Sequence, residues 1–392
     1  MKSMKTSKMN NSVCMLSTGH GPLDDRIYYK EVHSLRKKYS SIYMIMPDGK
    51  DDFPQDNEQI KFIPLRKVNS LLSRFLIIPQ ALIKLLKLKP TVCHFHDFEL
   101  IFTLPFIRLF SSIKIIYDIH EVYPEMAYDS QKIPKLLRPL MEKLVDISER
   151  FFARFAHYLI TADENIAERF KSPGYRVEIV YNYPRLQLFA PKEDQILQLK
   201  QKYYGKIPII YSGTMSINKG IYQMVRAMVL IKKYHDNILL ILAGPMDEQM
   251  RAKVKQIMRE LQLENNVQIL GKVPHHEIVN YISIAKVGLI AYLPIPKYHK
   301  NIPIKQFEYM SCGIPVLGAN LPPIASYIQK ANCGRTFDST KEEELAKGVR
   351  MILDDRNGWK RTSESGKKAV LAWWNWDKME PKLFSVYDQL LN

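Results

Sequence analysis

The stretch Asn301-Ile-Pro-Ile-Lys-Gln-Phe-Glu-Tyr-Met-Ser-Cys-Gly-Ile-Pro315 has the features of a short helix that leads into a strand. Asn301 is a suitable N-cap, and Pro303 fits the first turn of a helix. Gly313, followed by a proline, ends the helix. The apolar run that begins at Val316 is typical of a buried strand.

Two charged residues of this helix are three positions apart, so Lys305 and Glu308 share one face, while Phe307 and Met310 point toward a core. Free N–H groups at a helix N-terminus attract phosphate, and Lys305 adds a second positive charge. Glu308 can accept hydrogen bonds from sugar hydroxyls. The pattern alone leaves two interpretations open, a nucleotide-sugar site or an ordinary exposed ion pair on a surface helix.

A second loop of this kind runs from Ser212 to Gly220, between a strand at 209–211 and a helix at 221–233. Lys219 lies where the loop enters the helix, so its ammonium group and the free N–H groups can bind one phosphate. A solvent-exposed lysine at a helix start is the alternative interpretation.

The composition limits the classes of protein. With 392 residues, 46% of them hydrophobic, the chain is long enough for two or three domains with real cores. A net charge of +17 indicates an acidic partner, which is a nucleic acid, an anionic membrane surface or a phosphorylated substrate. The four cysteines are widely spaced, as expected for free thiols in a reducing compartment.

The N-terminal residues 1–11 lack the apolar core of a signal peptide, and no run of about 18 apolar residues occurs in the chain. We therefore expect a cytoplasmic protein whose membrane contact, if any, is peripheral. Residues 59–96 contain no acidic residue but several lysines and arginines among apolar residues. This segment fits either docking on anionic lipid or a core-facing helix with a solvated basic side.

Apolar strands alternate with helical patterns in both halves of the chain, which predicts parallel sheets covered by helices on both faces. The polar stretch 191–206 marks a change in composition. We therefore expect an α/β protein with an N-terminal Rossmann-like domain at 1–190, a C-terminal one at 191–372, and a terminal helix at 373–392. Strands are expected at 13–17, 42–46, 59–63, 92–95, 113–117, 158–161, 177–181, 209–211, 238–243, 267–270 and 287–291.

Helices are expected between these strands. In the first half they lie at 26–38, 71–86, 101–109, 134–155 and 162–170, and in the second half at 221–233, 248–261, 275–284 and 377–391.

Ligands of parallel α/β sheets bind beyond the carboxyl ends of the strands, so the residues that follow the strands are site candidates. Gly19, in the loop after the first strand, allows a ligand to approach the backbone closely. His94, His96 and Asp97 follow another strand and fit either loop anchors or a metal site, but we expect no metal because no further cluster completes a conventional site. His120 follows a third strand.

The stretches at 301–315 and 212–220 resemble the donor site of the retaining glycosyltransferases of family 4. The resemblance implies the GT-B fold, with two Rossmann-like domains facing across a cleft and a C-terminal helix that crosses back to the N-terminal domain. It also implies that Glu308 holds the ribose of the donor nucleotide, that Lys219 binds its diphosphate, and that His120 reaches the donor sugar. Further donor contacts are implied for Gly19, Gly213, Gly244, Lys272, Val273, Ile302 and Lys305.

Two positions depart from the family pattern. Many members have a glutamate where this chain has Lys300, and an arginine where it has Thr214. The chain therefore lacks one cation of the usual pair, and Lys305 is a candidate to replace it.

The resemblance predicts transfer of a hexose-type sugar, with retention, from a nucleotide-sugar to a hydroxyl of a glycan or polyprenyl-linked acceptor in polysaccharide synthesis. The catalytic candidates are His120, Lys219 and Glu308. No Asp-x-Asp motif occurs, so neither a metal nor another cofactor is expected. Two alternatives are a basic nucleic-acid-binding protein and a GT-B-like nucleotide-sugar epimerase.

Overall fold

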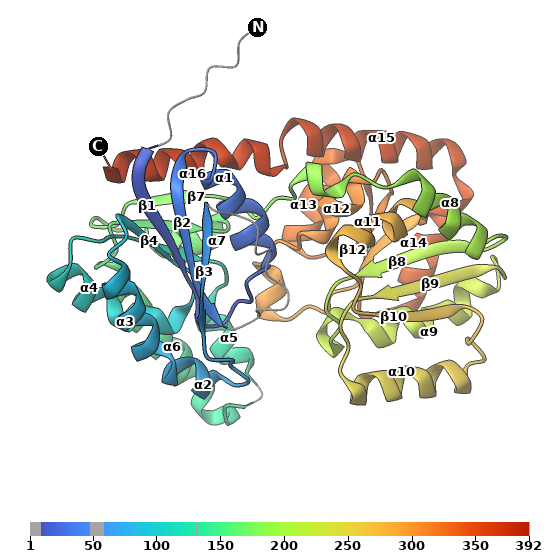
Figure 1. Ribbon diagram of the computed structural model, residues 1–392. Coiled ribbons are helices and arrows are strands. Elements are labelled where there is room, and N and C mark those ends of the chain that lie inside the picture. Colours follow the sequence, from blue (N-terminus) through green and yellow to red (C-terminus); the bar gives the residue numbers. More distant parts are fainter. Residues whose placement is uncertain (1–8, 48–58, 131, 392) are drawn as a thin grey trace, which may run out of the picture. The chain divides into compact units, whose positions relative to one another are not determined.

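The computed structural model describes residues 9–47, 59–130 and 132–391 (Figure 1). Contacts divide the chain into two units, one containing residues up to Asn182 together with those from Trp376 onward, and the other containing Tyr183–Asn375. The expectation that no signal peptide is present rests on residues 1–11, and residues 1–8 of these lie outside the described residues.

This division differs from the boundaries that composition suggests, after residues 190 and 372. The polar stretch 191–206 contains a helix, α8 (Glu193–Lys202), which contacts α11 (His275–Ile284) in the second unit. Asn280 of α11 accepts a hydrogen bond from the backbone N–H of Lys192 at 3.0 Å. The polar composition of this stretch therefore reflects a surface helix of the second unit.

Among the described residues, the first unit forms a seven-stranded sheet in the order β3-β2-β1-β4-β5-β6-β7, and all the neighbouring strands pair in parallel. The strands are β1 (Met9–Leu16), β2 (Tyr39–Pro47), β3 (Ile60–Leu65), β4 (Val92–Phe95), β5 (Lys114–Ile119), β6 (Tyr158–Thr161) and β7 (Val177–Ile179). The helices of the unit are η1 (Asp25–Val32), α1 (His33–Leu35), α2 (Leu71–Leu76), α3 (Ile78–Leu88), η3 (Phe98–Thr103), α4 (Leu104–Phe110), α5 (Tyr123–Asp129), η4 (Lys135–Leu137), α6 (Arg138–Ala153), α7 (Glu164–Glu168) and α16 (Trp376–Leu391).

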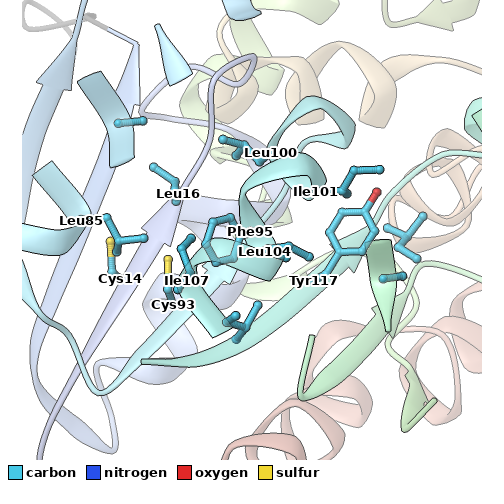
Figure 2. Close-up of a cluster of buried hydrophobic side chains, with 14 of the residues drawn as sticks. Cys14, Leu16, Leu85, Cys93, Phe95, Leu100, Ile101, Leu104, Ile107 and Tyr117 are labelled. Carbon is cyan, nitrogen blue, oxygen red and sulfur yellow. The ribbon is translucent and has the colours of Figure 1, made fainter. Parts of the chain in front are cut away.

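The core on one face of this sheet is built from strand residues such as Cys93 and Phe95 and from helix residues such as Leu85, Leu104 and Ile107 (Figure 2). All five are fully buried. Because β1, β4 and β5 lie in the middle of the sheet and are covered by helices, their side chains are apolar on this face. The chemistry of the unit is therefore concentrated where these strands end.

The last helix, α16, belongs to the first unit. The indole N–H of Trp376 donates to Ser34 Oγ at 2.8 Å, and Tyr387 Oη lies 3.0 Å from His94 Nδ1. Trp376 and Tyr387 are both fully buried. The chain's end therefore returns to the N-terminal sheet, as the GT-B resemblance implies.

The second unit forms a six-stranded sheet within the described residues, in the order β10-β9-β8-β11-β12-β13. Its strands are β8 (Ile207–Ser212), β9 (Ile238–Ala243), β10 (Val267–Gly271), β11 (Val287–Ile290), β12 (Val316–Ala319) and β13 (Gly334–Phe337). Besides α8 and α11, the helices are η5 (Leu186–Phe189), η6 (Ile217–Lys219), α9 (Ile221–Lys232), α10 (Glu248–Glu260), η7 (Pro296–His299), α12 (Lys305–Ser311), α13 (Pro322–Ala331), α14 (Glu342–Asp354) and α15 (Arg356–Ala372).

Several predicted helices differ from the observed ones. The predicted helix at 71–86 is divided at Ile77 into α2 and α3, because Pro79 in the first turn of α3 has no N–H to continue α2. In the helix predicted at 26–38, residues 26–32 belong to a π-helix, η1, which begins one residue earlier, at Asp25. The predicted helix at 101–109 is divided into η3 and α4.

The helix predicted to begin at Asn301 begins at Lys305 instead. The backbone N–H of Asn301 donates to Lys297 O at 3.0 Å, so Asn301 closes the preceding turn, η7, and does not cap α12. Phe307 and Met310 are buried as expected. Lys305 is also buried, although the sequence placed it on an exposed charged face.

Candidate functional site

The two sheets have the same strand order, which fixes where ligands bind. In each sheet all these strands run parallel, but the order in which successive strands are added reverses beside the first strand, between β1 and β4 in the first unit and between β8 and β11 in the second; we call this place the switch point of the sheet. Open α/β sheets bind their ligands at this reversal, beyond the carboxyl ends of the strands. The loops after these four strands are therefore the candidate site of each unit.

In the second unit, the loop after β8 depends on glycines. Gly213 has a φ of +111° and Gly220 a φ of +71°, both in the region that side chains rarely adopt. A Cβ at Gly220 would collide with the carbonyl oxygen of Ala291, which follows β11. The loop therefore lies directly against the end of β11 and then enters α9 with no side-chain cap on the helix.

Gly213 and Gly244 occupy equivalent positions after neighbouring strands. The N–H of Gly213 donates to Ala243 O at 2.8 Å, and the N–H of Gly244 donates to Gly271 O at 2.7 Å. Lys272 and Val273 follow Gly271 after β10. These predicted donor-binding residues thus lie along one edge of the sheet, at the ends of three adjacent strands.

Lys305 projects to this edge from the start of α12. Its Nζ lies 3.7 Å from the ring centroid of Tyr211 and 5.2 Å from that of Tyr292, and a Cβ at Gly213 would be 3.3 Å from it. Tyr211 belongs to β8 and Tyr292 follows β11, so Lys305 lies at the reversal of strand order. Within the described residues, this buried Nζ has no hydrogen-bond partner.

The electrostatic environment of Lys305 disfavours its charge. Burial lowers the pKa of Lys305 well below its ordinary value, and the nearby charge of Lys219 lowers it further, against a smaller opposing effect of Glu308. The sequence-predicted residues Lys219, Lys305 and Glu308 are therefore electrostatic neighbours. A negatively charged group beside Lys305 would relieve the cost of burying its ammonium group.

The other predicted residues of the second unit surround this position. Lys219 donates to the carbonyl oxygen of Thr214 at 2.9 Å, so the residue that replaces the family's arginine helps to orient the lysine. Glu308 is half-buried in α12, and Ile302 is half-buried in the segment before it. Tyr309 Oη accepts a hydrogen bond from the backbone N–H of Ser212 at 2.9 Å, which fixes α12 to the end of β8.

In the first unit, the corresponding position holds a buried network of charged groups. The Arg26 guanidinium, from η1, forms two hydrogen bonds of 2.9 Å to the Asp118 carboxylate, and its Nε also lies 3.0 Å from Glu31 Oε1. All three side chains are almost fully buried. Although burial opposes its ionisation, Arg26 and His120 hold the pKa of Asp118 well below its usual range, while burial raises the pKa of Glu31.

His120, the predicted catalytic histidine, is attached to this network. Its Nε2 lies 3.0 Å from Asp118 Oδ2 and 3.3 Å from His96 Nδ1. The carboxylate favours a proton on Nε2, which leaves Nδ1 as the acceptor. Burial lowers the pKa of His94 to about 3 and that of His96 well below its ordinary value, so both are neutral.

Four of these groups have the composition of a metal site. Ligand atoms of Glu31, His94, His96 and Asp118 lie within 4.8 Å of one another. Asp97, which the sequence grouped with the two histidines, instead accepts hydrogen bonds from Ser17 Oγ and Thr18 N in the neighbouring loop. The Arg26 guanidinium contacts the carboxylates of Glu31 and Asp118, so it already supplies a positive charge where a metal ion would bind.

The loop after β1 contains a residue that the sequence analysis missed. His20 Nδ1 lies 2.9 Å from Asp24 Oδ2, and the rings of His20 and His120 are 5.3 Å apart, edge to face. Although burial opposes protonation, the bond to Asp24 and the charge of Asp97 raise the pKa of His20 to about 9. Its position directly after Gly19, in a loop that follows a central strand, is the sequence signal for this cation.

Gly19 lies directly against a side chain of its own unit. A Cβ at Gly19 would collide with the guanidinium of Arg74, so the group that approaches this backbone closely is Arg74. Arg74, from α2, forms ion pairs with Asp97 at 2.6 Å and Glu99 at 2.5 Å. The close approach that requires a glycine here is thus an internal contact of the unit.

Two family models match the chain. The model described as Glycosyltransferase Family 4 matches residues 27–183, and the model described as Glycosyl transferases group 1 matches residues 193–369. Together they cover most of both units.

Three known proteins illustrate what the chain resembles in sequence or in structure. An uncharacterized glycosyltransferase of Methanocaldococcus jannaschii is 26% identical over 234 residues, which are 57% of this chain and 57% of the relative. Sucrose-phosphate synthase from Thermosynechococcus elongatus has a similar fold, with a TM-score of 0.79 at 18% identity over 98% of this chain and 99% of that one. Anabaena HepE in complex with UDP-glucose has a TM-score of 0.77 at 14% identity, over 97% of this chain and 100% of that one.

The sequence matches are partial. The chain spans 57% to 58% of the length of the first curated relatives. The solved structures show a shared GT-B fold over nearly the whole chain.

Proposed function

Since the chain belongs to the glycosyltransferases of family 4, we propose that it transfers a sugar from a nucleotide-sugar donor to a hydroxyl group of an acceptor. The observation that carries this proposal is the buried Nζ of Lys305 at the switch point of the second sheet, which has no hydrogen-bond partner among the described residues. A folded protein gains little from such a group on its own. The group becomes favourable when a phosphate binds beside it.

The donor diphosphate, in this proposal, lies against the loop at 213–220. Lys305 and Lys219 provide two positive charges, and the uncapped N-terminus of the twelve-residue helix α9 provides free N–H groups. Glu308 accepts hydrogen bonds from the ribose hydroxyls. The segment at Lys272 and Val273 contacts the base.

These groups also account for catalysis of bond cleavage. As the glycosidic bond to the nucleotide breaks, negative charge accumulates on the diphosphate, and the two lysines stabilise it without requiring a metal ion. We propose that the sugar is a hexose and that its anomeric configuration is retained, with the acceptor hydroxyl attacking on the face that the nucleotide leaves and giving its proton to the departing phosphate. An inverted product anomer, detected by NMR, would contradict retention.

In the first unit, we assign the donor-sugar contact to His120. Because Asp118 favours the proton on Nε2 of His120, Nδ1 accepts a hydrogen bond from a sugar hydroxyl. The Arg26–Asp118 pair acts through His120 by holding the imidazole in this orientation. HepE, the Anabaena structure cited above, was solved with UDP-glucose, which makes UDP-sugars the first donors to test.

We further propose a cytoplasmic protein and a glycan or polyprenyl-linked acceptor in polysaccharide assembly. Among the described helices, none has the length and apolar character needed to cross a membrane. The net charge of +17 also fits a nucleic acid. Donor binding that added RNA and DNA leave unchanged would exclude that alternative, and isomerisation of the donor without acceptor would indicate an epimerase.

The donor assignment is tested by thermal unfolding with UDP-, GDP-, ADP- and CMP-sugars. A ligand at about 100 times its Kd stabilises the folded state by roughly 2.7 kcal/mol, so one donor is expected to raise the Tm. Lys305→Met, Lys219→Ala and Glu308→Ala should each reduce this shift. Lys253→Met, which removes an exposed lysine of α10, is the matched control and should keep it. A folded protein that none of the donors stabilises would overturn the proposal.

A further inference from the structure

The helices α2, α3 and α4 of the first unit expose an unusual number of large apolar side chains. None of the six residues of α2 is buried, although four of them are leucine or phenylalanine. Leu72 and Leu76 are 70% and 71% exposed, and Leu109 and Phe110 at the end of α4 are 71% and 72% exposed. Side chains of this kind cost free energy in water unless another surface covers them.

These side chains belong to one connected surface. The helix α2 contacts α3, and α4 contacts η3. The rings of Phe75 in α2 and Phe102 in η3 are 6.4 Å apart, and those of Phe106 and Phe110 in α4 are 4.9 Å apart. Figure 1 shows α2, α3 and α4 on the same side of the first unit. We call this surface the α2–α4 face; its exposed apolar residues are Leu71, Leu72, Phe75, Leu76, Ile83, Phe102, Phe106, Leu109 and Phe110.

The charge of this face has a single sign. Within residues 59–117, all of which the structure describes, the acidic residues are Asp97 and Glu99, and both are buried. Exposed cations of the same segment include Arg66, Lys67, Lys87, Lys89 and Arg108. This segment combines exposed apolar side chains with exposed cations and has no exposed carboxylate of its own, which matches the surface of an anionic bilayer.

A second apolar row of the same unit lacks this charge pattern. Leu140, Leu144, Ile147 and Phe151 follow one another at helical spacing along α6 and are each about half exposed. Acidic residues of α6, among them Glu142, interrupt the cations around this row. The two rows therefore differ in charge while they resemble each other in apolar exposure. Because α6 packs against η3 and α4, its row tests whether charge selects the docking residues within neighbouring parts of one unit.

The α2–α4 face is also held in place from within the unit. Arg74 of α2 forms ion pairs with the buried Asp97 and Glu99. Asp97 in turn accepts a hydrogen bond from the N–H of Thr18 at 2.7 Å, in the loop of the candidate site. Through Arg74 and Asp97, α2 is therefore linked to the loop that follows β1.

We propose that the α2–α4 face docks on the surface of a bilayer that contains anionic lipids. The leucines and phenylalanines enter the boundary between the headgroups and the acyl chains, and the surrounding cations bind the lipid phosphates. Docking on the bilayer surface is compatible with the absence of a membrane-crossing helix among those described. The proposal concerns binding alone and stands independently of the reaction proposed above.

The experiment is co-sedimentation of the full chain with vesicles of phosphatidylcholine, with and without phosphatidylglycerol. The wild type should bind the anionic vesicles and not the neutral ones, and binding should weaken as salt increases. Leu72→Ser/Leu76→Ser should weaken binding about tenfold or more. Leu140→Ser/Leu144→Ser on α6 should leave it unchanged.

A charge variant keeps the test informative if the leucine variant does not fold. Lys87→Gln/Arg108→Gln leaves the apolar residues in place and should weaken binding to anionic vesicles about tenfold. Absence of vesicle binding by the wild type, or equal losses in the α2 and α6 variants, would overturn the proposal. A dimer that Leu72→Ser/Leu76→Ser dissociates, in a protein that does not bind vesicles, would assign the face to a second copy of the chain.

Discussion

The two units have the same strand order, but the buried basic residues near the switch points of their sheets differ in whether the fold supplies their hydrogen-bond partners. In the first unit, the guanidinium of Arg26 is hydrogen-bonded to Asp118 and lies against Glu31, so this buried cation has its partners within the fold. In the second unit, Lys305 is buried against two tyrosine rings, and its Nζ has no hydrogen-bond partner among the described residues. The first arrangement serves the fold, and the second is suited to a ligand.

This contrast separates two uses of buried charge. Removing one partner from a satisfied pair leaves an uncompensated charge and destabilises the protein. Removing a cation that has no partner takes away a cost of folding and an attraction for the ligand at the same time. The comparison therefore predicts that removing the buried cation lowers the stability of the protein in the first unit. In the second unit, removing the buried lysine weakens ligand binding without lowering stability.

The largest effect is expected for Arg26→Met. The change leaves the carboxylates of Asp118 and Glu31 buried without their cation and should cost about 3–5 kcal/mol in the free energy of unfolding. Urea unfolding followed by circular dichroism measures it. Arg350→Met, which breaks an exposed pair with Asp354, should cost less than about 1 kcal/mol. An equal loss of unfolding free energy in the two variants would show that the buried network stabilises the protein no more than an exposed ion pair does.

The next effect is expected for Lys305→Met, which keeps the apolar contact with Tyr211 but removes the ammonium group. Donor binding should weaken by about 1.5–3 kcal/mol, or roughly 10- to 150-fold, since charged hydrogen bonds to phosphate are lost. The free energy of unfolding without ligand should stay the same or rise. Isothermal titration calorimetry and urea unfolding measure the two quantities. A less stable variant with unchanged affinity would reverse the roles assigned to the two units.

A smaller effect is expected where the first unit holds the end of the chain. Ser34→Ala leaves the buried indole N–H of Trp376 without its acceptor and should cost about 1–2 kcal/mol in the free energy of unfolding. Ser385→Ala, an exposed position on the same helix, should change it by less than about 0.5 kcal/mol. If both variants unfold at the same urea concentration as the wild type, the hydrogen bond from Trp376 does not stabilise α16.

The strands could be predicted well from the sequence, because their buried apolar runs have clear limits. The expected strands at 92–95, 158–161 and 238–243 agree with β4, β6 and β9 at both ends. The strand β13 and the helices α13 to α15 were not predicted. The segment Gly334-Arg-Thr-Phe337 forms β13 through pairing with β12, and its own residues give little apolar signal.

The candidate site could be predicted in part. Lys219, Lys305 and Glu308 were found from helix and loop signals, and they are electrostatic neighbours in the structure. The burial of Lys305 could not be predicted, because it depends on Tyr211 in β8 and on Tyr292 in the loop after β11. The network of Arg26, Glu31 and Asp118 was missed for the same reason, since sheet pairing brings together residues that are far apart in the sequence.

The most direct test of this account is the proton uptake that accompanies donor binding. Burial lowers the pKa of Lys305, so at a pH above that folded-state value the free protein holds Lys305 partly neutral, and stability rises with pH toward the ordinary lysine pKa. A bound diphosphate raises the pKa again, so binding at a pH between the folded-state pKa and the ordinary lysine pKa should take up protons from the buffer. Calorimetric titrations of the stabilising donor in two buffers with different ionisation enthalpies measure this uptake. The account predicts uptake by the wild type and by Lys253→Met but not by Lys305→Met; equal uptake in all three proteins, with equal affinity, would contradict it.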